Sequence, residues 1–190
     1  MNIKTTTVTL TAVLAALVVV FDYAMKFSGF KIPFPWLPVL KFDFTGVPIV
    51  LSLLILGFVP GAFASSVAFL AIAVRSPDLI GASMKALAEF STILGMFAGL
   101  VWLEKKPRLA KLASFALGCL ARVAVMALAN LAVLPIQGMP FNAVIAISPL
   151  VAVFNLFHAL ISIFGGYLLY EALRRRVPSL ILEEEANRNP

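Results

Sequence analysis

Six polar or ionisable side chains interrupt the long apolar stretches of this sequence, and their types limit the chemistry available to it. They are Lys85, Glu89, Arg122, Asn130, Asn155 and His158. A charge at the centre of a membrane helix costs about 2.5–3.5 kcal/mol on insertion scales, so such residues usually face a bundle interior and find partners. We therefore expect most of these side chains to converge on one site, with Arg122 as a separate, structural residue that satisfies carbonyls or a carboxylate.

Two pairs among them share a helix face. Lys85 and Glu89 stand four residues apart, which allows an ion pair, and Asn155 and His158 stand three apart. An amide and a neutral imidazole both offer donors and acceptors, which suits a heteroaromatic ligand with amide-like edges. Two plainer interpretations stay open: a structural ion pair for the first, and helix–helix hydrogen bonding for the second.

The sequence lacks the motifs of several catalytic sites. No P-loop, His-Glu-x-x-His or Gly-x-Ser-x-Gly pattern occurs. One His and one Cys are too few for a typical metal or thiol–imidazole site, and Glu89 is the one carboxylate well inside an apolar stretch. We therefore expect no enzyme, no metal and no cofactor of the chain's own, and we interpret Cys119 as a packing residue.

Composition indicates the environment of these residues. Hydrophobic residues make up 62% of the 190 and charged residues 13%, against about 45–50% and about 25% in soluble domains. The mean hydropathy is +1.02. This is more apolar surface than one soluble core hides, so lipid must solvate much of it. The net charge of +6 lies in clusters beside apolar stretches, which indicates membrane topology rather than nucleic-acid binding.

The apolar stretches predict an all-α membrane protein with six transmembrane helices. Crossing the hydrocarbon core takes roughly 20 residues. The expected spans are 8–25, 47–58, 62–74, 79–103, 109–134 and 143–173. The second and third are short, and they form either a helical hairpin around the break at 57–61 or a re-entrant pair. We expect Pro135 to end the fifth span and the sixth to start properly near Pro149.

The connector 28–41 contains Pro33, Pro35 and Pro38, which cannot continue a helix. We expect it to fold over a cavity as an irregular loop. Phe34, Trp36 and the following Phe42 would supply the apolar cover that small-molecule sites need. An interfacial aromatic belt is the alternative for Trp36.

The positions of Lys and Arg predict the orientation. With the N-terminus inside, eight basic residues are cytoplasmic: Lys4, Lys105, Lys106, Arg108, Lys111, Arg174, Arg175 and Arg176. Four are outside: Lys26, Lys31, Lys41 and Arg75. Both termini are therefore expected in the cytoplasm of a plasma-membrane protein, with a transmembrane domain at 1–176 and a polar tail at 177–190. In this orientation five of the six intramembrane polar residues fall in the outer half or towards the middle of the membrane: Lys85, Glu89, Asn130, Asn155 and His158.

Small residues recur on one face of the first span. Thr5, Thr9, Ala12 and Ala16 are spaced four apart or nearly so. Such a stripe lets another helix approach closely, so we expect Ala12 and Ala16 to form a docking face.

Four segments in order resemble the S components of energy-coupling factor (ECF) transporters, most of all the riboflavin-binding ones. Leu40-Lys41-Phe42-Asp43-Phe44-Thr45-Gly46-Val47-Pro48 resembles the start of the family's second span. Ala12 and Ala16 match its Ala-x-x-x-Ala motif. The stretch from Arg122 to Asn130 is similar to the fifth span, and Phe154-Asn155-Leu156-Phe157-His158 to the sixth.

The resemblance implies a six-helix protein that captures a vitamin from outside beneath the connector between spans one and two. It implies separate partners: a transmembrane coupling subunit that docks on the Ala12 and Ala16 face, and two ABC-type ATPases that bind the ATP. ATP-driven rearrangement would then release the vitamin inside.

The chain departs from riboflavin-binding relatives at His158, where they usually have Lys. Riboflavin remains the best single prediction; pantothenate or a queuosine-type base is the alternative in this class, and an intramembrane enzyme or structural subunit is the alternative outside it. The predicted substrate-binding residues are Leu40, Phe42, Asp43, Lys85, Glu89, Asn130, Asn155 and His158.

Overall fold

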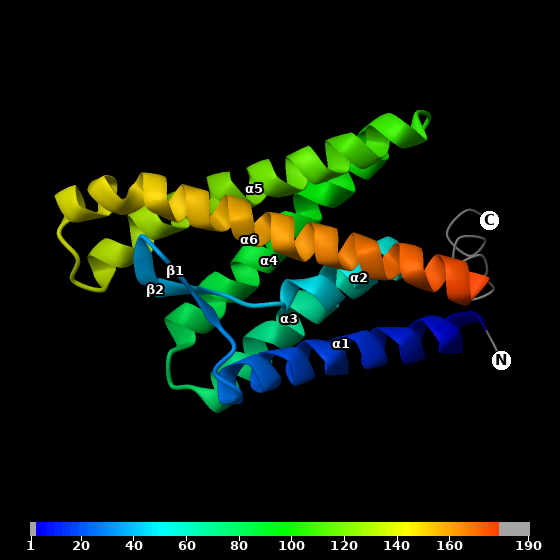
Figure 1. Ribbon diagram of the computed structural model, residues 1–190, viewed down its shortest axis with the longest axis horizontal. Coiled ribbons are helices and arrows are strands. Elements are labelled where there is room, and N and C mark those ends of the chain that lie inside the picture. The colour runs from blue at the N-terminus through cyan, green and yellow to red at the C-terminus, as the bar shows by residue number, and fades with distance from the viewer. Residues whose placement is uncertain (1–2, 179–190) are drawn as a thin grey trace.

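The computed structural model describes residues 3–178 and shows a helical bundle with one small β-hairpin (Figure 1). Successive helices run up and down, so the start of α1 and the end of α6 lie at the same end. The elements are α1 (Ile3–Phe27), β1 (Ile32–Phe34), β2 (Leu37–Phe42), α2 (Gly46–Leu56), α3 (Phe58–Arg75), α4 (Leu79–Trp102), α5 (Pro107–Ile136) and α6 (Phe141–Arg176).

Five of the six helices are long and apolar enough to cross a membrane, and large apolar side chains such as Val74, Leu128 and Leu168 are exposed on their outer faces. The protein is therefore a multi-pass membrane protein. The exception is α2, whose 11 residues rise about 17 Å, well short of the hydrocarbon core. The helical bundle is confirmed, whereas the count of six full spans stays a prediction. Of the predicted polar tail 177–190, residues 179–190 lie outside the described residues.

The break between α2 and α3 is narrower than the sequence predicted. It consists of Gly57 alone, at φ +97°, a backbone conformation that favours glycine. Pro60 falls in the first turn of α3, where no helical N–H is needed. The two helices pack against each other as a hairpin.

One proline prediction agrees with the structure to within one residue, and one was wrong. The fifth helix, expected to end at Pro135, ends at Ile136. The sixth begins at Phe141, eight residues before Pro149, which lies inside it. Pro135 sits in a last turn, where a disrupted hydrogen bond matters little, and membrane helices tolerate an interior proline because neighbouring groups satisfy the freed carbonyl.

The connector predicted as an irregular loop is an antiparallel hairpin. Ile32 pairs with Phe42 and Pro33 with Lys41, and the register shifts between Pro33 and Phe34. The prolines concealed these strands because proline is read as a strand breaker, although it is tolerated at sheet edges. This two-stranded sheet has two edges, so Pro33 costs it little.

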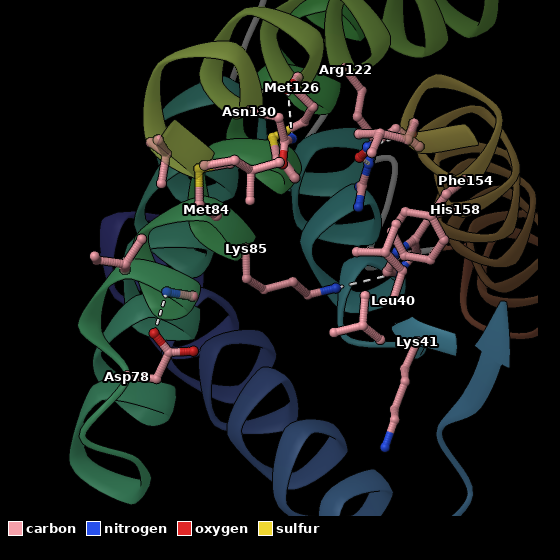
Figure 2. Close-up of a pocket in the computed structure, with 18 of the residues that line it drawn as sticks. Leu40, Lys41, Asp78, Met84, Lys85, Arg122, Met126, Asn130, Phe154 and His158 are labelled. Atoms are coloured by element: carbon pink, nitrogen blue, oxygen red, sulfur yellow. Dashed lines mark hydrogen bonds between the residues drawn. The ribbon is translucent and has the colours of Figure 1, made fainter. Parts of the chain in front are cut away.

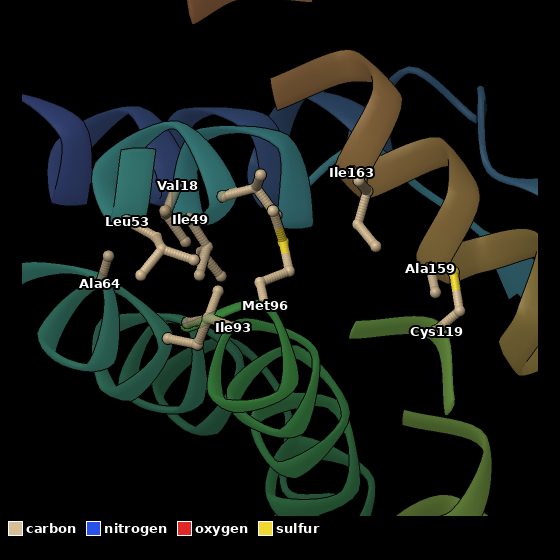
Figure 3. Close-up of a cluster of buried hydrophobic side chains, with 11 residues drawn as sticks. Val18, Ile49, Leu53, Ala64, Ile93, Met96, Cys119, Ala159 and Ile163 are labelled. Carbon is tan, nitrogen blue, oxygen red and sulfur yellow. The ribbon is translucent and has the colours of Figure 1, made fainter. Parts of the chain in front are cut away.

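The core joins all six helices. Val18, Ile49, Leu53, Ile93 and Ile163 are buried together, and Cys119 packs against them as predicted (Figure 3). Glycines bring α4 and α5 into backbone contact, because a Cβ at Gly95 or Gly99 would collide with the α5 main chain. This contact lies in the second half of α4 and leaves its first half to line a cavity.

Candidate ligand-binding cavity

A cavity of about 370 Å³ lies between β2, α4, α5 and α6, at the opposite end of the bundle from the start of α1 (Figure 2). Its volume falls within the range of about 300–1,000 Å³ usual for small-molecule sites. Most of its wall is apolar, and polar groups enter from each of the four elements. The lining includes Val39, Leu40, Lys41, Asp43, Asp78, Met84, Lys85, Arg122, Met126, Asn130, Val133, Val151, Phe154, Asn155 and His158.

The structure brings the predicted site residues together, six of them on the cavity wall: Leu40, Asp43, Lys85, Asn130, Asn155 and His158. Phe42 and Glu89 are not on the wall. Phe42 lies behind Phe154, with the two rings stacked at 4.8 Å between centroids. Glu89 is fully buried behind Lys85. Both therefore support lining residues.

Lys85 is the polar centre of the cavity. Figure 2 shows its side chain reaching from α4 towards His158 on α6. Its ammonium donates to Asp43 Oδ1 at 2.7 Å and Glu89 Oε1 at 2.9 Å, and it lies 3.3 Å from His158 Nε2. Because an ammonium has three donors and no acceptor, these three contacts use all of them.

His158 is nearly buried and neutral in this arrangement. Nε2 lies 3.3 Å from Lys85 Nζ and 3.5 Å from Asp43 Oδ1. Because an ammonium can only donate, the shorter contact favours the tautomer with the ring proton on Nδ1. That Nδ1 has no hydrogen-bond partner within residues 3–178. A buried donor without a partner costs about 1–3 kcal/mol. A ligand that accepts a hydrogen bond from Nδ1 would remove that cost.

The pair of Glu89 and Arg122 forms the base of the network. Glu89 Oε1 forms an ion pair with Arg122 Nη1 at 3.0 Å, and the two residues are 0% and 1% exposed. Arg122 also donates to Thr92 Oγ1 at 3.3 Å and Asn155 Oδ1 at 3.4 Å. Arg122 thus pairs with a carboxylate, which was one of the two structural roles predicted for it. It was expected to lie apart from the site, however, and it lines the cavity.

Asp43 is held at the junction of β2 and α2 by its own turn. Its Oδ1 accepts from the Thr45 amide at 3.1 Å and the Thr45 hydroxyl at 2.7 Å, the side-chain turn typical of Asp. Burial alone would raise the pKa of Asp43, but the ammonium groups of Lys85 and Lys31 hold that pKa well below its usual value. Asp43 is therefore a fixed anion that orients Lys85.

The two asparagines are oriented by their own helices. Asn130 Nδ2 donates to the Met126 carbonyl at 2.7 Å, and Asn155 Nδ2 to the Val151 carbonyl at 2.9 Å. The amide oxygen of Asn155 accepts from Arg122, whereas that of Asn130 accepts no hydrogen bond from the described residues. Asn130 thus keeps an acceptor for a ligand.

An aromatic group closes one side of the cavity. Phe154 packs between Phe42 and the edge of His158, and Phe34 joins them with 1% exposure. Trp36 makes a T-shaped ring contact with Phe34 and is 65% exposed. The hairpin therefore lies over the cavity through Phe34 and Phe42, and Trp36 remains available to an interface.

Sequence reasoning missed the apolar wall and one cation. Met126 and Val133 share a face of α5 with Arg122 and Asn130, and Val151 shares one of α6 with Asn155. Helical spacing from the polar residues would have identified them. Lys41 lines the cavity as well, and the sequence did not indicate this, because the connector was expected to be an irregular loop.

The predicted docking residues lie elsewhere. Ala12 and Ala16 are exposed on α1, and no residue of α1 lines the cavity. The small-residue stripe is thus physically separate from the ligand site.

Comparison with known proteins gives a fold. No family model matches the chain, and no curated protein matches it in sequence. A solved structure of the S component of a bacterial ECF transporter superposes with a TM-score of 0.76 at 24% identity, over 92% of this chain and 98% of that one. The resemblance found in the sequence is thereby confirmed at the level of architecture, and the chain has the fold of an ECF-transporter S component.

Proposed function

We propose that this protein is the substrate-binding S component of an ECF-type importer and that it captures a vitamin, riboflavin being the best candidate, from outside the cell. The observation that carries the proposal is the cavity beneath the hairpin, where an apolar wall surrounds polar groups held by a charge network. That combination is the usual form of a small-molecule site.

The shape of the wall supports a flat ring as ligand. Leu40 on β2 and Met84 and Met126 on facing helices are apolar, and Phe154 offers an aromatic edge and face. Aromatic side chains bind planar ligands by offset stacking and edge contacts. Leu40 would pack on the ring, and Phe42 would act through Phe154 or by direct contact when a ligand binds.

The polar groups support a ligand with amide-like or imide-like edges. Asn130 contributes an acceptor and His158 Nδ1 a donor, and Asn155 is fixed by Arg122. Riboflavin-binding relatives usually have Lys at the position of His158. In this chain Lys85 places an ammonium beside His158, so the site still contains a cation there.

Partners and orientation follow as part of the proposal. A transmembrane coupling subunit would dock on the Ala12 and Ala16 face of α1, and two ABC-type ATPases would bind ATP, so this chain performs no catalysis. Both termini would be cytoplasmic, with the cavity opening outside. The basic residues at the α4–α5 turn and the end of α6 lie at the same end as the start of α1, which supports that orientation.

Mass spectrometry of the small molecules released from purified protein tests the proposal. We expect one vitamin in roughly stoichiometric amount, and a yellow, fluorescent preparation in the case of riboflavin. A colourless protein that releases pantothenate or a queuosine-type base would keep the function and change the substrate. A protein that releases no vitamin and binds none would contradict it and favour a structural subunit or an intramembrane enzyme.

A further inference from the structure

A second hollow adjoins the cavity on the side of α1 and α3. It has a volume of about 490 Å³ and is lined by residues of α1, the hairpin, α3 and α4. The two hollows share six lining residues: Val39, Lys41, Asp43, Asp78, Gly81 and Lys85. They are therefore neighbouring compartments that meet at Lys41 and Lys85.

The two compartments differ in charge. The inner cavity is balanced, because Asp43 and Glu89 alternate with Lys85 and Arg122 at contact distance. A charged ligand group there would lack a counter-ion of its own. The part of a ligand held in the inner cavity is therefore expected to be uncharged.

The outer compartment carries an excess of cations. Five basic residues line it against two acidic ones, and they are Lys26, Lys31, Lys41, Arg75 and Lys85 against Asp43 and Asp78. Asp22, buried behind the wall, adds one more carboxylate. Even with Asp22 included, the positive charges outnumber the negative ones.

The acidic groups are already engaged. Asp22 pairs with Arg75 through two hydrogen bonds of 2.9 and 3.1 Å, and with Lys31 at 3.5 Å. Asp78 caps α4 by accepting from the Gly81 amide at 2.8 Å. Within residues 3–178 the ammonium groups of Lys26 and Lys41 have no hydrogen-bond or ion-pair partner.

Lys41 is placed to serve both compartments. It follows Leu40 on β2, and Figure 2 shows its side chain pointing away from Phe154 and His158. A ligand with its ring beside Leu40 would therefore extend its other end towards the ammonium of Lys41, with Lys31 and Arg75 on the far wall. Ammonium and guanidinium groups bind carboxylate and phosphate oxygens through charge-assisted hydrogen bonds.

We propose that the ligand has two parts: an uncharged, hydrogen-bonding ring held in the inner cavity and an acidic group, carboxylate or phosphate, held in the outer compartment by Lys41 and its basic neighbours. This inference rests on the proposed function and narrows its substrate class to ring compounds that carry an acidic group, a class that contains riboflavin 5′-phosphate but not riboflavin itself.

Titration of ligand pairs that differ by an acidic group tests the proposal. Riboflavin and its 5′-phosphate, and nicotinamide and nicotinate, are added to the purified protein in low-salt, phosphate-free buffer. In a pair that binds, we expect the acid to bind about tenfold more tightly than its neutral partner. The preference should shrink as salt is raised, since exposed charges are screened over about 10 Å at 0.1 M.

Two lysine variants locate the effect. Lys41→Gln should reduce the acid preference to threefold or less, because it should weaken binding of the acid more than binding of the neutral partner. Lys105→Gln makes the same charge change at the opposite end of the bundle and should keep the preference. Inorganic phosphate should compete with the acid and not with the neutral partner.

The outcomes separate this inference from the function beneath it. A pair whose neutral member binds as tightly as the acid, or more tightly, would overturn the acidic subsite and leave the proposed importer intact. An acid preference that survives Lys41→Gln unchanged would also overturn the assignment to this compartment. If no member of any pair binds and the purified protein releases no vitamin, both the proposed function and this inference are overturned.

Discussion

At the scale of single residues, the cavity is organised by alternating charges contributed from parts of the chain far apart in sequence. Asp43 precedes α2, Lys85 and Glu89 lie on α4, and Arg122 lies on α5. The pairing of Lys85 with Glu89 could be predicted, because residues four apart on a helix are neighbours. The contacts with Asp43 and Arg122 could not, because periodicity within one helix does not indicate which other helix it faces.

Replacing Glu89 with Gln tests the network itself. Both Lys85 and Arg122 would lose their shared carboxylate while staying buried. Breaking a buried pair by removing one partner costs about 3–5 kcal/mol, so thermal unfolding in detergent should show a loss of that order. Glu104→Gln, at an exposed position, should stay within about 0.5 kcal/mol of the wild type. Equal stability of the two variants would show that the network is not maintained in the membrane protein.

Replacing Asn155 with Ala tests its role at the cavity wall. We expect ligand binding to weaken by about 1–3 kcal/mol, the cost of an unsatisfied buried partner, as measured by calorimetric titration. Ser148→Ala is the matched control, since Ser148 also bonds the carbonyl four residues earlier on α6 but does not line the cavity. Unchanged affinity in the Asn155 variant would remove this residue from the binding site.

At the scale of elements, the helices could be predicted and the hairpin could not. Long apolar runs indicate membrane helices by length alone, and the observed helices begin or end within a few residues of the predicted spans. The hairpin was hidden because its strands are short and contain Pro33 and Pro38. What fixes it over the cavity is packing of Phe34 and Phe42 on Phe154 of α6, a contact that no local pattern specifies.

The aromatic contact predicts how fast a ligand leaves. Phe42→Ala would remove the stack on Phe154, and such pairs contribute about 0.5–1.5 kcal/mol beyond area burial. We expect the dissociation rate constant, measured by stopped-flow fluorescence, to rise roughly three- to tenfold as the hairpin loosens. Phe30→Ala, at a side chain 72% exposed, should leave the rate unchanged. The same rate in both variants would mean that the hairpin does not retain the ligand.

At the scale of the whole molecule, the fold separates two surfaces: a cavity formed by β2, α4, α5 and α6, and an exposed small-residue face on α1. The sequence indicated both, because costly polar residues must converge and small residues permit close helix approach. It did not indicate where the small-residue face of α1 lies relative to the cavity, because that position depends on tertiary packing.

That separation predicts that transport and binding can be uncoupled. Ala16→Trp should abolish vitamin uptake in cells that hold the partner subunits and leave the affinity of the purified protein for the vitamin unchanged. Ala124→Trp places the same bulk on an exposed position of α5 and should preserve both. If Ala16→Trp abolished binding instead, the docking face would be wrongly assigned.

The central claim is that the cavity beneath the hairpin binds a vitamin, and equilibrium titration of wild-type protein beside a cavity-filled variant tests it most directly. Met84→Trp adds bulk at a lining position of α4 that takes no part in the charge network. We predict one-to-one vitamin binding by the wild type and none by a folded Met84→Trp protein. Vitamin binding of equal affinity in both would place the ligand elsewhere and contradict the account.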